Sequence, residues 1–168
     1  MDSLLAWLRA RGADCIPHSG GTLYGHLTRT CLHVVRWGAS AHVVRGALFH
    51  SVYGTRSFRH RLLSHEERPI VRSLIGGDAE QLVFLFSTLD RKKIFSEGNK
   101  VPPVCRPERV LRELAIIELA NLADQVASPQ PPTSVHANTS TRVLLAHIQF
   151  LYGASRTDAA ASDVSWQR

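Results

Sequence analysis

Hydrophobic residues recur every three to four positions along most of the chain, which is the spacing that places them on one face of an α-helix. Residues 22–37 show this pattern most clearly, with one face made of Leu23, His26, Leu27, Thr30, Cys31, Val34 and Val35. The same spacing predicts further helices at residues 3–11, 40–53, 66–75, 78–90, 108–126 and 139–151. No segment alternates as a strand does, so we expect an all-α fold, a bundle of about six to seven helices.

Polar segments rich in glycine and proline separate these helices. Residues 55–65 are a basic connection, and residues 92–107 contain one glycine and three prolines, which predicts a loop able to act as a lid. Residues 128–134 are a turn or linker. We therefore expect one domain over residues 1–153 and a disordered, Ala/Ser-rich tail at 154–168.

Composition limits the kind of protein this chain can be. Hydrophobic residues make up 44% of it, which fits a folded domain. No window approaches about 18 apolar residues, so we expect no membrane span, and an early acid without a cleavage site argues against a secretory signal. The three cysteines, Cys15, Cys31 and Cys105, are widely separated, which suits a reducing compartment. These features predict a soluble, cytoplasmic protein.

The net charge of +6 comes mainly from arginine, whose planar group suits phosphate and carboxylate oxygens. The arginines are spread along the whole chain and do not cluster with aromatic residues, as they do in nucleic-acid-binding proteins. The charge therefore favours a small anionic ligand over nucleic acid. The sequence is compatible with a homodimer but does not decide the oligomeric state.

Among nine histidines, His26 and His50 stand out because they lie in apolar helical segments. A buried imidazole has to satisfy both ring nitrogens, and a metal ion together with a hydrogen-bond acceptor does so. A core histidine bonded to a backbone carbonyl is the structural alternative. His18 is a third candidate ligand.

Three strings of the sequence carry a resemblance: GTLYGHLTRT, then ALFHSVYGT with its histidine 24 residues after the first, then IELAN. In this order they resemble the HD-domain superfamily of metal-dependent phosphohydrolases, most of all its guanosine tetraphosphate hydrolases. In that branch a late KLAD segment supplies an aspartate. The string HSVYGT, with WG before it and LDR after it, also resembles DUF6817, a domain of unknown function. The likeness covers residues 16–126.

The resemblance implies a metal site with altered ligands. His26 and His50 fall on the family's histidines, Ser51 falls on the aspartate of the HD pair, and Asn121 on the late aspartate. Two carboxylates are thereby replaced, so it implies one divalent metal ion such as Fe, Zn or Mn. His18 and the Asn121 carbonyl are the further expected ligands. The nitrogens of His26 and His50 should then lie about 3 to 3.5 Å apart, with Asn121 facing them from a third helix.

Three functions remain open. The first is a metal-dependent hydrolase of a small anionic, phosphorylated or nucleotide-like molecule, with Tyr53, Arg91 and Ser51 expected to contact substrate. Tyr53 lies three residues after His50, so a continuing helix places both on nearly the same face. The second is a mononuclear non-haem iron oxygenase or tailoring enzyme. The third is a non-catalytic ligand-binding module built on a degenerate HD site.

Overall fold

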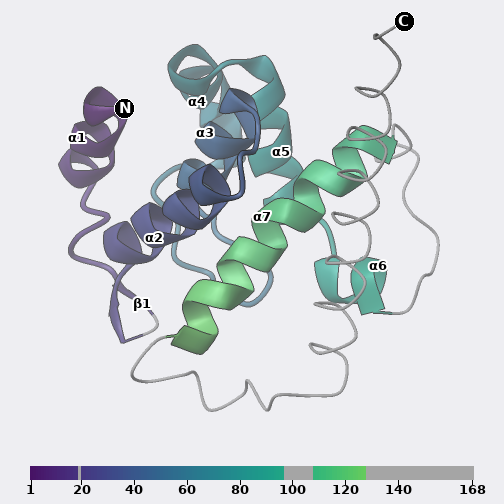
Figure 1. Cartoon of the computed structure of the whole chain (residues 1–168). Helices are drawn as coiled ribbons and strands as arrows, with labels where there is room; N and C mark the ends of the chain where they lie inside the picture. The colour runs from purple at the N-terminus through teal and green to yellow at the C-terminus, as the bar shows by residue number, and fades with distance from the viewer. Residues whose placement is uncertain (19, 97–107, 128–168) are drawn as a thin grey trace, which may run out of the picture.

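The computed structural model of the chain describes residues 1–18, 20–96 and 108–127 (Figure 1). Its helices are α1 (Asp2–Ala10), α2 (Leu23–Arg36), α3 (Ala41–Phe49), α4 (Arg68–Ile75), α5 (Gly77–Thr88), α6 (Arg91–Ser96) and α7 (Glu108–Ala127). A 3-10 turn, η1 (His65–Glu67), precedes α4. Strands β1 (Pro17–His18) and β2 (Gly21–Thr22) form an antiparallel pair between α1 and α2. The all-α class and the number of helices are confirmed.

The sequence explains where α2 begins and which face it buries. The Thr22 hydroxyl oxygen accepts a hydrogen bond from the Gly25 N–H at 3.2 Å and so caps the helix. The predicted face is buried from Leu23 to Val34, whereas Val35 at its edge is 49% exposed. This face carries the polar residues His26 and Thr30, and α2 therefore turns both into the core.

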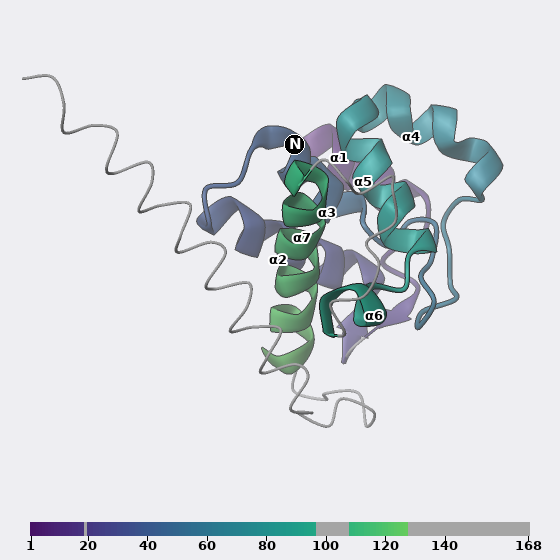
Figure 2. The same ribbon diagram turned by 90° about the vertical axis from the view of Figure 1, so that its right-hand side faces the viewer.

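Four helices enclose the core. Helix α2 packs on α3 and α7, α3 packs on α5, and α7 also contacts α3 and α5. In Figure 2 the long α7 stands upright in front of α2, with α5 and α6 to its right. Gly46 of α3 allows this close packing, because a Cβ there would lie 3.3 Å from Ile117 Cδ1 and 3.5 Å from Leu82 Cβ.

Two predicted boundaries were wrong. The helix expected over 40–53 ends at Phe49, and the chain turns through residues 50–53, with the Gly54 N–H donating to the Ser51 carbonyl at 2.9 Å. The loop expected over 92–107 begins as α6, which is too short for a helical period to be visible in the sequence. The strand pair was not predicted either, because two-residue strands show no alternation.

The remaining expectations fall on residues that the structure does not describe. These are the rest of the lid over 97–107, the turn at 128–134, the helix at 139–151 and the tail at 154–168. Within residues 1–18, 20–96 and 108–127, no helix combines the length and apolar character needed to cross a membrane.

Candidate functional site

Three histidines from different elements meet in the core. His26 lies in the first turns of α2 and His50 at the C-terminal cap of α3, and both are fully buried. Their Nε2 atoms lie 3.1 Å apart, within the distance expected for nitrogens that share a metal ion. His18 of β1 stacks its ring on that of His26, with 4.1 Å between ring centroids and 18° between planes.

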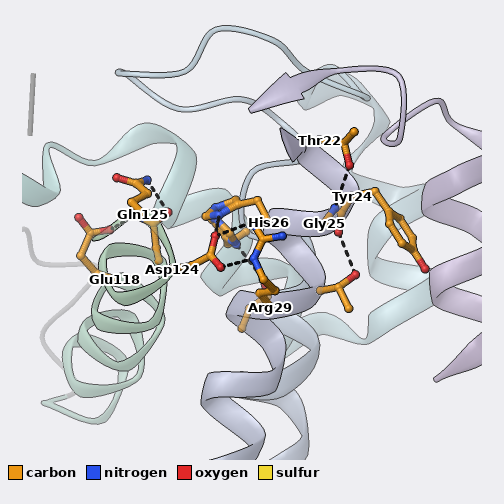
Figure 3. Close-up of polar contacts among 12 residues, drawn as sticks. Thr22, Tyr24, Gly25, His26, Arg29, Glu118, Asp124 and Gln125 are labelled. Carbon is orange, nitrogen blue, oxygen red and sulfur yellow. Dashed lines mark hydrogen bonds and ion pairs between the residues drawn. The ribbon is translucent and has the colours of Figure 1, made fainter. Parts of the chain in front are cut away.

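A carboxylate from α7 holds the other side of His26. Asp124 Oδ2 lies 2.7 Å from His26 Nδ1, and the Asp124 side chain is 2% exposed. The same carboxylate accepts hydrogen bonds from Arg29 of α2 (Figure 3). His26 of α2, His50 at the end of α3 and Asp124 of α7 thus form one buried polar group, although they lie far apart in the sequence.

The hydrogen bonds of the two histidines determine where their lone pairs lie. His26 Nδ1 faces the Asp124 carboxylate, and His50 Nδ1 faces the Ala47 carbonyl oxygen at 2.8 Å. Both partners are acceptors, so each ring carries its proton on Nδ1 and leaves the lone pair on Nε2. Two lone pairs then face each other across 3.1 Å. This arrangement requires a cation between the rings, either a proton or a metal ion.

Burial keeps the His18 and His50 imidazoles neutral, whereas hydrogen bonds keep the Asp124 carboxylate charged. Burial, and then the neighbouring His26, hold the pKa of His50 well below its usual range. The same two causes lower the pKa of His18 to about 4. Burial alone would raise the pKa of Asp124, but hydrogen bonds from His26 and Arg29 outweigh it and bring the pKa to about 2. Neutral imidazoles at physiological pH are the form that binds metals.

Two buried polar atoms beside the histidine pair have no hydrogen-bond partner in the part of the chain that the structure describes. They are His18 Nδ1 and Thr30 Oγ1. Thr30 follows His26 by one helical turn on the buried face of α2. Buried polar atoms normally find partners, so both fit a polar ligand bound at this place.

Asn121, the predicted fourth ligand, belongs to a neighbouring polar chain. Its Nδ2 donates to Glu118 Oε2 at 3.4 Å, and its Oδ1 accepts from Gln125 Nε2 at 3.0 Å. Neither of these hydrogen bonds goes to a histidine. The carboxylate that hydrogen-bonds to His26 from the third helix is Asp124, one helical turn after Asn121.

The Phe86 ring separates Arg91 from the histidine pair. Its Nε donates to Glu118 Oε2 at 2.8 Å, and it also donates to the Phe86 carbonyl. The guanidinium sits 3.7 Å from the centroid of the Phe86 ring, which in turn meets the His50 ring at 4.9 Å. Arg91 therefore borders the site with its charge already paired.

The two other predicted substrate contacts lie on the turn after α3. Ser51 is buried directly after His50. Tyr53 points elsewhere, because its hydroxyl donates to Glu80 Oε1 of α5 at 3.3 Å. Burial, and then the Glu80 charge, raise the pKa of this hydroxyl. The structure thus places Tyr53 in a second polar cluster.

Asp124 was the residue that the sequence analysis missed, although a signal for it was present. Residues 122–124 spell Leu-Ala-Asp, the last three letters of the KLAD segment. The resemblance was placed on the preceding ELAN, whose last residue is Asn121, one helical turn before Asp124. Arg29 carried no signal beyond following His26 by three residues on the same helix.

The donor set at this site is small. In the described ranges no group of three or more His, Cys, Asp or Glu side chains is arranged to hold one metal ion. The protein offers two convergent nitrogens, from His26 and His50, with the unpartnered His18 Nδ1 beside them. That chemistry fits a divalent metal ion whose other ligands are water or substrate.

Comparison with known proteins identifies a family but no activity. Residues 7–91, just over half of the chain, match the family model of a domain of unknown function, DUF6817. The match includes His18, His26 and His50 and ends before α7, which carries Asp124. Neither the curated proteins nor the solved structures yield a match to the chain.

Proposed function

Because the chain belongs to the DUF6817 family, a domain of unknown function, we propose its function from the chemistry of the site: His26 and His50 bind one divalent metal ion in a metal-dependent hydrolase of a small anionic molecule. The observation that carries this proposal is the pair of Nε2 atoms 3.1 Å apart with acceptors on both Nδ1 atoms. A metal ion satisfies both lone pairs at once.

A metal ion fits this pair better than a shared proton does. Two bonds of about 2.1 Å to one ion place the nitrogens about 3 to 3.5 Å apart. Metal-binding histidines donate their other N–H to a carboxylate or a backbone carbonyl, which are the partners of His26 and His50 here. A shared proton needs one ring to be an imidazolium. Burial disfavours that charge in His50, and in His26 the neighbouring Asp124 charge is already offset by Arg29.

The resemblance to the HD-domain phosphohydrolases supports the same proposal. With Asp124 in place of Asn121 as the late aspartate, one of the two missing carboxylates is present near the histidines. Ser51 still stands where the resemblance expects the other. Because Asp124 contacts Nδ1 of His26 and not the space between the Nε2 atoms, it would orient a ligand, and the two or three imidazoles suit a single metal ion.

Charge favours an anionic substrate. Arg29 pairs with Asp124 and Arg91 with Glu118, so the two arginines and two carboxylates near the histidines cancel. The imidazoles add no charge when neutral. A divalent ion would therefore remain uncompensated by the protein, and an anionic ligand such as a phosphorylated molecule would offset its charge.

The residues then divide the work. His26 and His50 hold the metal ion, while Asp124 and the Ala47 carbonyl fix the orientation of the two rings. When bound, such an ion supplies Lewis-acid activation of water. His18 Nδ1 and Thr30 Oγ1 offer hydrogen bonds or a further ligand beside it.

The test is the metal content of the folded protein purified without added metal, measured by mass spectrometry. We expect about one equivalent of Zn or Mn in the wild type and none in His50→Gln. His33→Gln, on the same helix as His26 but outside the site, is the control and should keep the metal. Loaded protein should release phosphate from members of a panel of phosphorylated small molecules.

Two other results would each favour a different function. Stoichiometric iron without phosphate release would favour the mononuclear iron oxygenase. A folded protein that neither carries nor takes up Zn, Mn or Fe would overturn the metal site and leave the non-catalytic binding module.

A further inference from the structure

Arg29 connects the solvent to the buried carboxylate of the site. Its side chain is 47% exposed, whereas the Asp124 side chain is 2% exposed. Arg29 Nε donates to Oδ1 at 2.5 Å and Nη2 donates to Oδ2 at 3.2 Å, a two-point grip on both oxygens (Figure 3).

Gly25 makes room for this grip. A Cβ at Gly25 would lie 3.0 Å from Arg29 Nη1, closer than a side chain normally tolerates. Glycine inside a helix usually lowers stability relative to alanine. Residue 25 lies in the first turn of α2, one position before His26. The absence of a side chain there lets the guanidinium lie back along the helix toward Asp124.

The grip fixes the direction of the whole hydrogen-bond chain. A carboxylate held on both oxygens does not rotate, so Oδ2 stays on His26 Nδ1 at 2.7 Å. His26 then keeps its proton on Nδ1 and its lone pair on Nε2, toward His50. Without Arg29 the Asp124 carboxylate could rotate away from Nδ1, and the His26 lone pair would no longer be directed to His50.

We propose that Arg29, in the space left by Gly25, is the positioning residue of the site: it holds Asp124 so that His26 presents Nε2 for metal binding. This inference rests on the proposed metal site and names a residue that acts on it from outside. The hydrogen bonds of Arg29 go to Asp124, and Asp124 in turn contacts His26, so the effect of Arg29 passes through Asp124 and His26.

The test uses Zn²⁺ affinity, measured by chelator competition on the full chain. Arg29→Ala should weaken it about ten- to a hundredfold, the effect of losing an outer partner of a ligating histidine. Arg29→Lys should recover only part of this, because lysine cannot grip two oxygens. About 20 mM guanidinium, a concentration far below that of a denaturant, should restore affinity to Arg29→Ala through the exposed site. Arg36→Ala, an exposed arginine of the same helix, is the control and should bind as the wild type does.

Gly25→Ala separates positioning from folding. It should weaken Zn²⁺ affinity about tenfold, because the new methyl group displaces the guanidinium. The melting temperature should change little, because the better helix former offsets the weakened ion pair. A variant that only damaged the fold would lose both together.

Nitrogen-15 spectra of the histidine rings in metal-free protein test the positioning directly. The wild type should show His26 protonated on Nδ1, and Arg29→Ala should show a mixture of the two tautomers. Zinc binding in the wild type with equal affinity and tautomer in both variants would overturn this inference and leave the proposed function intact. A wild type that binds no zinc would overturn the proposed function, and the spectra alone would then decide whether Arg29 orients His26.

Discussion

Two buried carboxylates in this protein are each gripped by an arginine, and they differ in what lies beyond. Glu80 accepts from Arg68 on both oxygens, at 2.6 and 2.9 Å, and also from Tyr53 and Arg72. Asp124 accepts from Arg29 on both oxygens as well. Its remaining partner is His26, which makes the difference between the two sites.

Every group around Glu80 has its hydrogen-bond partner, whereas, among the described residues, the group around Asp124 ends in a nitrogen whose lone pair has no donor. Tyr53 donates its one hydroxyl proton to Glu80, and the network closes there. His26 instead passes the interaction on to a second nitrogen, whose lone pair faces that of His50 at 3.1 Å. The same ion-pair arrangement thus ends at a satisfied hydroxyl in one place and at an imidazole lone pair in the other. Under the proposed function, that lone pair is a metal ligand.

The largest effect on stability should come from breaking the closed network. Glu80→Gln leaves Arg68 and Arg72 without their buried counter-charge, so we expect a loss of about 3 kcal/mol in the free energy of unfolding. Urea unfolding followed by circular dichroism measures it. Zn²⁺ affinity of the folded variant should not change. The exposed Glu108→Gln is the control and should cost less than about 0.5 kcal/mol. A Glu80→Gln protein of normal stability but weak metal binding would reverse the roles of the two clusters.

The Asp124 carboxylate should make the stability of the protein depend on pH. Because the pKa of Asp124 is lowered to about 2, its contribution is present above the unfolded pKa of about 3.9 and is lost as pH falls through the folded value. The expected loss is on the order of 2 kcal/mol between about pH 5 and 1. Asp124→Asn should be less stable at neutral pH and should lose less on acidification. Parallel curves for the two proteins would mean that Asp124 is not held by His26 and Arg29 in solution.

The smallest effect concerns the hydroxyl of Tyr53. Tyr53→Phe removes one hydrogen bond to Glu80, which should cost about 1 kcal/mol of stability and leave Zn²⁺ affinity unchanged. Thermal melts and metal titrations of the same preparation check both parts. If the variant melts normally but binds metal or substrate more weakly, Tyr53 acts in the site after all.

The sequence predicted the helices with a clear period and the meeting of His26 with His50. It predicted Tyr53 on nearly the same face as His50, which requires a helix that continues past His50. Helix α3 ends at Phe49, and the Tyr53 hydroxyl donates to Glu80. Spacing rules hold only as far as the helix does.

The choice between Asn121 and Asp124 could not be made from periodicity. Both positions of α7 are buried, at 6% and 2% exposure, because this helix is covered on several sides by its neighbours. A burial pattern therefore does not tell which of the two reaches the histidines. Only the tertiary packing of α7 against α2 settles it, by bringing Asp124 next to Arg29 and His26.

The most direct test of the metal site is an anomalous difference map from crystals grown with Zn²⁺. The account predicts one strong peak about 2.1 Å from the Nε2 atoms of both His26 and His50, with Asp124 still bonded to Nδ1 of His26. A map without a peak between these two nitrogens, whether or not zinc binds elsewhere in the crystal, would contradict the metal site. A shared proton would then be the cation between the rings.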